Sequence, residues 1–191
     1  MSRGANMFCE ERVAQMAAYL LSKGGGRMPY LKLMKLMYLS DRESMDRFGE
    51  PITGDRMVAM PHGPVLSRSL DLMNGTETGE EGWKNWISDA DNYELKLLCD
   101  SLSRDDLDEL SEAEISILDA VYASFGKMSK WEIRDYTHSK CPEWTDPRGG
   151  AFTINPENVF RALGKPEELV RHLSDRMREF SELDSIAYGL K

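Results

Sequence analysis

Residues 28–41 read MPYLKLMKLMYLSD, and this stretch decides the fold. Pro29 stands where a helix can begin, because the proline ring presets the backbone angle of a first helical turn. From Leu31 to Leu39 the apolar side chains fall on nearly every face of a helix, which is typical of a helix packed on all sides. We therefore predict a buried central helix that ends at the turn Phe48-Gly49-Glu50-Pro51.

Helices are also predicted near both ends of the chain. Apolar residues recur at helical spacing over 5–22, and Gly24-Gly25-Gly26 follows as a stop. Asn155-Pro156 opens a short helix and Pro166 opens a last one, so that helices occupy most of 155–188. We expect these terminal helices to pack on the central region.

Two capping boxes mark helix starts in the second half of the chain. Ser111 stands three residues before Glu114, and Ser129 stands three residues before Glu132. In this device the hydroxyl and the carboxylate each satisfy a backbone N–H that is left free at the helix start. We therefore predict one helix after each of the two serines.

The middle of the chain gives weaker signals. The segment 52–64 is rich in glycine and proline and is expected to be irregular, with Pro64 opening the next helix. An acidic, glycine-rich loop is expected from Thr76, and alternation over 93–97 favours a short strand. The predicted fold class is mainly α: one compact domain over 1–191 with about six or seven helices and at most a short strand pair.

The composition bears on the class of function. The 191 residues are 41% hydrophobic and 30% charged, which permits a folded core. Lys and Arg number 24 against 33 Asp and Glu, and the net charge of −9 repels a nucleic-acid backbone overall. No apolar run approaches the ~20 residues of a membrane span, no secretory signal is visible, and the three separated cysteines do not suit a disulfide framework. We expect a soluble, cytoplasmic protein without membrane partners.

The sequence contains no recognisable catalytic or cofactor motif. It lacks a phosphate-binding glycine loop, Gly-x-Ser-x-Gly and His-Glu-x-x-His. His138 and Cys141 with Cys99 would supply only three ligands, whereas a structural zinc site takes four. A small hydrolase that uses His138 and nearby carboxylates stays open as an alternative, although Asp135 and His138 at this helical spacing favour a local hydrogen bond. We predict no enzyme, no metal and no cofactor.

Two groups of short motifs carry a family resemblance. The first contains 31–41, 49–55 and then Ala59-Met60-Pro61-His62-Gly63-Pro64-Val65, and the second contains 122–129 followed by Thr137-His138 and Trp144. Together they resemble the Panacea domain, the SocA-like antitoxin family of bacterial and phage toxin–antitoxin systems, over about residues 28–145. The motif positions are Lys35, Leu36, Tyr38, Gly63, Pro64, Val65, Thr137, His138 and Trp144.

The resemblance implies a mainly helical antitoxin that neutralises a toxin encoded beside it by direct binding. One departure is that Glu143 separates Pro142 from Trp144, which the family would place next to each other. The motif residues by themselves favour structural roles, with Leu36 and Tyr38 as core positions. An adaptor of phage or host origin, which presents a partner protein to a protease or other machinery, is the alternative function.

Two polar segments that carry large apolar side chains are candidates for the toxin contact. They are 51–62 and 140–152, because apolar side chains in such loops often become buried only when a partner binds. The candidate contact residues are Met57, Met60, His62, Trp144 and Phe152. The two segments would form one patch if the fold brings Gly63-Pro64 near Thr137-His138, and in the alternative interpretation Trp144 only seals the domain.

The helices predicted over 115–125 and 130–136 superficially read as a helix-turn-helix. The second of them carries Lys130 and Arg134 together with two acidic residues and is close to neutral. A recognition helix normally brings net positive charge to the DNA groove. We therefore predict no specific DNA binding by this chain alone.

Overall fold

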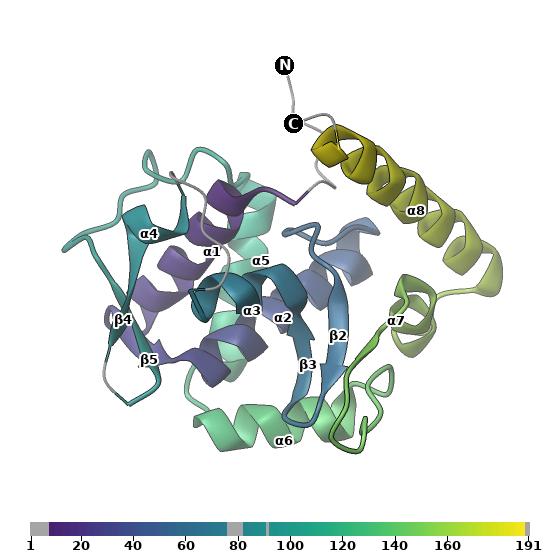
Figure 1. Ribbon diagram of the computed structural model, residues 1–191, viewed down its shortest axis with the longest axis horizontal. Coiled ribbons are helices and arrows are strands. Elements are labelled where there is room, and N and C mark those ends of the chain that lie inside the picture. The colour runs from purple at the N-terminus through teal and green to yellow at the C-terminus, as the bar shows by residue number, and fades with distance from the viewer. Residues whose placement is uncertain (1–7, 76–81, 91, 190–191) are drawn as a thin grey trace.

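A computed structural model of the chain describes residues 8–75, 82–90 and 92–189, and within them it contains eight helices and six strands (Figure 1). The helices are α1 (Glu10–Lys23), α2 (Tyr30–Phe48), α3 (Ser67–Met73), α4 (Trp83–Trp86), α5 (Glu112–Phe125), α6 (Lys130–Lys140), α7 (Pro156–Ala162) and α8 (Glu167–Gly189). The strands are β1 (Arg27–Pro29), β2 (Met57–Met60), β3 (Gly63–Leu66), β4 (Ile87–Ala90), β5 (Glu94–Leu97) and β6 (Phe152–Thr153). The start of the predicted N-terminal helix, 5–7, and residues 76–81 of the predicted acidic loop lie outside the described residues.

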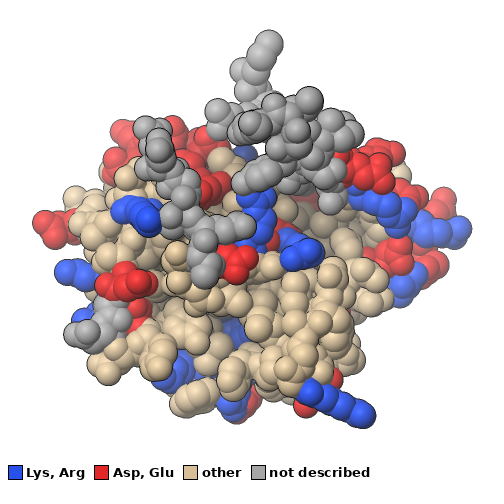
Figure 2. All heavy atoms as spheres, viewed as in Figure 1, with Lys and Arg blue, Asp and Glu red and all other residues tan. Residues whose placement is uncertain are grey.

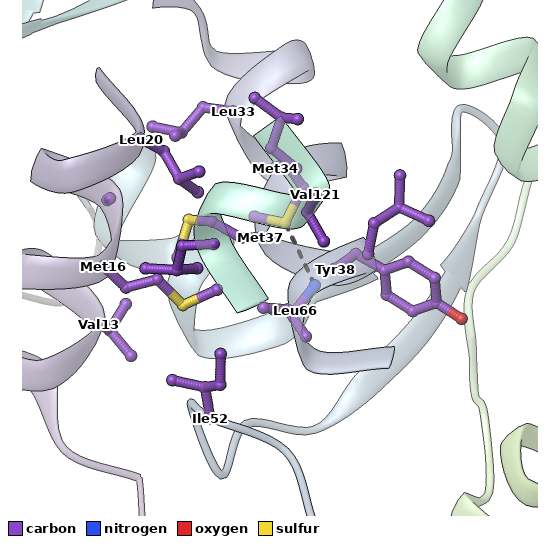
Figure 3. Packing of buried hydrophobic residues seen from close by; sticks show 14 of the residues in the cluster. Val13, Met16, Leu20, Leu33, Met34, Met37, Tyr38, Ile52, Leu66 and Val121 are labelled. Carbon is purple, nitrogen blue, oxygen red and sulfur yellow. Dashed lines mark hydrogen bonds between the residues drawn. The ribbon is translucent and has the colours of Figure 1, made fainter. Parts of the chain in front are cut away.

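The helix α2 lies at the centre of the fold, as predicted. It contacts α1, α5, α6 and β3, and its Lys35 and Tyr38 are fully buried. It begins directly after Pro29 and ends at Gly49, which adopts the left-handed conformation that glycine accommodates without strain. Figure 3 shows Met34 and Met37 of α2 among side chains from α1, α5 and β3, where the sulfur of Met34 accepts a hydrogen bond from the Leu66 N–H (3.3 Å).

The predicted fold class is wrong in its strand content. The described residues form two three-stranded antiparallel sheets, in the orders β1-β5-β4 and β3-β2-β6, and not a mainly α fold with at most one strand pair. The strand expected over 93–97 is present as β5. The main error concerns Pro64, which was expected to open a helix but pairs with Ala59 inside the hairpin β2–β3.

The hairpin β2–β3 cannot be predicted from the sequence pattern, for a physical reason. Each of its strands has four residues, which is too short for a clear alternation of apolar and polar side chains. Proline is tolerated in β3 because this strand lies at the edge of its sheet, where a missing N–H interrupts no further pairing. The helix expected at Pro64 begins three residues later, at Ser67 of α3.

The helix starts predicted from capping boxes are confirmed. Ser111 and Ser129 each accept a hydrogen bond from the backbone N–H of the glutamate three residues on, and that glutamate bonds back to the serine N–H. The predicted C-terminal helices are present as α7 and α8. In Figure 1, α7 lies on the side of the hairpin that faces away from β4 and β5, and the first turns of α8 lie beyond α7 at the edge of the molecule.

Candidate functional site

The motif positions form one connected set of contacts that begins at Lys35 of α2. The ammonium of this lysine is buried and donates a hydrogen bond to the Pro64 carbonyl of β3 (2.6 Å). Burial lowers the pKa of Lys35 to about 7, because the charged form loses its hydration there. The lysine therefore ties the central helix to the edge strand of the hairpin, on the side that Pro64 leaves without an N–H.

Gly63 is the point at which the hairpin meets α6. Its φ of +94° favours glycine, and a Cβ added there would lie 2.9 Å from Lys35 Nζ, 2.9 Å from Thr137 Oγ1 and 3.2 Å from His138 Cδ2. Thr137 is fully buried. The structure thus brings Gly63-Pro64 next to Thr137-His138, although the two pairs lie far apart in the sequence.

Glu143, which interrupts the expected Pro-Trp pair, is buried against the central helix. Its Oε1 accepts hydrogen bonds from the Tyr38 hydroxyl (2.7 Å) and from Arg42 Nε (2.7 Å). Burial and the carboxylate together raise the pKa of Tyr38 well above its usual value. The inserted residue thus anchors the loop after α6 to α2.

Trp144 connects the same loop to the hairpin. Its ring stacks on that of His138, with the two centroids 4.0 Å apart and the planes inclined by 2°. Its indole Nε1 donates a hydrogen bond to the Met60 carbonyl (3.0 Å). His138 Nε2 is buried without a hydrogen-bond partner, and burial lowers the pKa of this imidazole.

The motif piece at 49–55 has a structural role that the sequence analysis did not assign. Oδ1 of the fully buried Asp41 accepts hydrogen bonds from the backbone N–H groups of Ile52 (2.9 Å) and Thr53 (3.0 Å). Asp55 accepts one from the Ser69 N–H (2.7 Å) in the first turn of α3. These two carboxylates hold the loop that leads into β2, and only their position within the motif could have pointed to them.

The side chains considered for catalysis or metal binding lie in or next to this cluster. Burial raises the pKa of the Cys141 thiol to about 12, so the reactive thiolate is disfavoured. Asp135, considered as a partner of His138, pairs with Arg134 (2.6 Å). In the described parts of the chain, no group of three or more His, Cys, Asp or Glu side chains is placed to hold a metal ion.

The candidate contact residues lie on and around the sheet β3-β2-β6. The strand β6 pairs with β2, with Phe152 opposite Ala59, so that the segments 51–62 and 140–152 lie side by side. Phe152 is 43% exposed, His62 is exposed, and Met60 and Trp144 are half-buried. Met57 points into the core, with 6% of its surface exposed.

The outer face of this sheet is hollowed and mainly uncharged. A depression of about 370 Å³ is lined by Val58, Met60, Leu70 and Phe152 among others, and Figure 2 shows few charged side chains over β2 and β3. Val58 and Leu70 could not be assigned to this surface from the sequence, because they come together only when the hairpin and α3 are placed. We define the sheet-face patch as four side chains of this lining, Val58, Met60, Leu70 and Phe152, together with His62 in the turn between β2 and β3 and Trp144, which bonds to the Met60 carbonyl.

Residues 33–145 match the family described as antitoxin SocA-like, Panacea domain. The chain belongs to the SocA-like antitoxin family. The matched span covers the cluster from Lys35 to Trp144, and it stops before β6, α7 and α8. Comparison with curated proteins and with solved structures gave no match.

The family assignment confirms the resemblance and places the chain among antitoxin-like proteins. Within the family motif, the side chains of Lys35, Tyr38 and Thr137 are fully buried. None of the helices in the described ranges is long and apolar enough to cross a membrane.

Proposed function

We propose that this protein neutralises a cognate toxin, encoded beside it, by binding the toxin directly through the sheet-face patch. The membership in the SocA-like antitoxin family supports the part of this proposal that concerns neutralisation of a toxin. The arrangement of the sheet-face patch supports the part that concerns the binding surface. The buried motif residues hold the hairpin, α6 and the following loop together, and the patch is the surface that they fix in place.

The composition of the patch suits a protein partner. Half-exposed apolar and aromatic side chains of this kind dominate the energy of protein interfaces when they fill a partner's pocket. Phe152 projects from an edge strand of two residues, and Trp144 presents the part of its ring that His138 does not cover. An uncharged centre surrounded by polar residues is the usual anatomy of an interface core and its rim.

Co-expression with the adjacent gene product tests the proposal. We expect the toxin to arrest growth on its own, and we expect this chain to restore growth and to co-purify with the toxin. Absence of both rescue and co-purification would contradict the proposed function. The half-life of the toxin separates the two modes of neutralisation: direct blocking leaves it unchanged or longer, and an adaptor that delivers the toxin to a protease shortens it.

We expect neutralisation without specific DNA binding by this chain. In the described structure, Glu132 is engaged in the capping box of α6 and Asp135 pairs with Arg134 on the same helix. This helix therefore brings little net positive charge to a DNA groove. A salt-sensitive, sequence-specific gel shift of the chain's own promoter would contradict this expectation.

A further inference from the structure

A second hollow lies between α8 and the body of the protein, with walls both from the span that matches the family and from the residues that follow it. Its volume is about 420 Å³, within the range of about 300–1,000 Å³ that is usual for small-ligand pockets. The loop before β2, the end of α2, the segment after β6 and one face of α8 form its walls. The apolar side chains among its lining are Met45, Pro51, Met57, Ile154, Pro156 and Met177.

Three of the six apolar side chains that line the pocket are methionines. This composition favours a pocket that binds its occupant reversibly. Thioether side chains are unbranched and polarisable, so they repack around different shapes at little cost. Such side chains are used at surfaces that accept partner side chains. The buried position of Met57, unexpected for a contact residue, is thus compatible with a role at this pocket.

One polar group in the pocket lining has no partner. Ser174 of α8 is 3% exposed, and its hydroxyl oxygen is buried without a hydrogen bond in the described structure. A buried hydroxyl without a partner is unfavourable, and most such groups in proteins are satisfied. The hydroxyl is carried on a single rotatable bond, so it can turn to an occupant that offers a polar atom.

The pocket and the depression on the sheet face share two lining residues. Arg56 and Thr153 line both the pocket and the depression on the sheet face. A partner segment that crosses Thr153 at the edge of the sheet can therefore cover the patch and place one side chain in the pocket.

We propose that this pocket receives a tyrosine side chain of the toxin, whose ring packs on the methionines and whose hydroxyl bonds to Ser174. This inference rests on the proposed function. A tyrosine matches both features at once, because it combines a large apolar ring with a single hydroxyl at its tip. A leucine or phenylalanine would fill the same volume and leave Ser174 without a partner.

The side-chain analogues p-cresol and toluene test the pocket without the toxin. With methyl-labelled methionine, we expect millimolar p-cresol to shift the Met45, Met57 and Met177 signals and to leave that of Met16, buried in the core, unchanged. Ser174→Ala should weaken p-cresol binding about five-fold and leave toluene binding unchanged, since it removes one hydrogen bond. Ser124→Ala, on the exposed side of α5, should change neither.

Three results would overturn the proposal at this stage. They are no shift at the three pocket methionines, equal binding of p-cresol and toluene, and p-cresol binding that Ser174→Ala does not weaken. A thermal melt of each variant confirms folding, and Ser174→Ala is expected to fold because it removes a hydroxyl that has no partner.

A variant whose side chain fills the pocket then tests whether the toxin binds there. Ser174→Leu should lower the affinity for the toxin about 30-fold, as expected for loss of a central aromatic anchor, when binding is measured at a temperature at which a thermal melt shows the variant to be folded. If the wild type binds the toxin and both Ser174→Leu and Ser174→Ala bind it equally well, the pocket proposal fails and the proposed function stands. If the wild type binds no toxin, the proposed function fails, whatever p-cresol does.

Discussion

The imidazole of His138 lies flat against the indole of Trp144, with 4.0 Å between the ring centroids and 2° between their planes. The same indole donates its N–H to the Met60 carbonyl of β2. One side chain therefore holds together α6, the loop that follows it and the hairpin. Trp144 is both a structural anchor and a part of the sheet-face patch, so the two interpretations of this residue are compatible.

Trp144→Ala is expected to lower the free energy of unfolding by about 2–4 kcal/mol, because it removes the ring stack, the packing and the hydrogen bond to Met60. Trp144→Phe keeps an aromatic ring but loses the N–H donor and part of the ring surface, for which we expect about 1–2 kcal/mol. Urea unfolding of both variants measures the difference. A Trp144→Ala protein as stable as the wild type would show that the stack does not hold the loop.

Gly63→Ala is expected to destabilise the fold by about 3 kcal/mol, since a Cβ at φ +94° would press on Lys35, Thr137 and His138. Gly164→Ala is the matched control. Gly164 also has a positive φ (+75°), but a Cβ there would meet nothing within 4 Å, so only backbone strain of about 1 kcal/mol is expected. Equal losses in urea unfolding of the two variants would argue against the contact cluster.

Lys35→Met should change how stability depends on pH above neutrality. The pKa of Lys35 is about 7 in the folded protein and about 10.4 in an unfolded chain, so the unfolded state binds more protons between these values. Stability of the wild type should therefore rise from pH 7 to 9, by up to about 1.4 kcal/mol per pH unit, relative to the methionine variant. Unfolding free energies at pH 7, 8 and 9 measure this, and parallel curves for the two proteins would contradict it.

Other titrating groups largely cancel in the comparison of the two proteins. The raised pKa values of Cys141 and Tyr38 make stability fall with pH only above the values that these groups have in the unfolded chain, about 8.5 and 10. The lowered pKa of His138 acts below about 6.5. All three groups are present in both proteins.

Asp41→Asn should change how stability depends on pH below neutrality, where the wild type is expected to lose stability as the pH rises. Burial raises the pKa of Asp41 to about 7, against about 3.9 in an unfolded chain, so the native state binds more protons in between. Wild-type stability should therefore fall from pH 4.5 to 7 relative to the asparagine variant, whose carbonyl can still accept from Ile52 and Thr53. Unfolding measured at pH 4.5, 6 and 7 tests this, and a difference that is independent of pH would contradict it.

Much of the helical framework can be predicted from local sequence. The dense apolar pattern after Pro29 predicts α2, and the serine–glutamate pairs predict the starts of α5 and α6, because these signals act within one or two turns. The hairpin could not be predicted in this way. Its pairing depends on Lys35 reaching the Pro64 carbonyl and on the space left by Gly63, and both are tertiary contacts.

The candidate site, like the fold, can be predicted from the sequence only in part. The sequence places Met60, Trp144 and Phe152 in segments that the fold does bring together. It does not reveal that Met57 faces inward, because the inward face of a four-residue strand is set by its partners. It also gives no sign of the pocket beside Ser174, which exists only because α8 lies across the loop before β2.

The most direct test of the account is the affinity of purified toxin for the Phe152→Ala variant. Phe48→Ala is the matched control, since Phe48 is also half-exposed (50%) but lies at the end of α2, outside the sheet-face patch. Both variants should keep the wild-type stability within about 0.5 kcal/mol, as expected for surface positions. We predict that Phe152→Ala weakens toxin binding by about 2 kcal/mol or more and that Phe48→Ala leaves it unchanged; equal affinities for the two variants, or no binding by the wild type, would contradict the account.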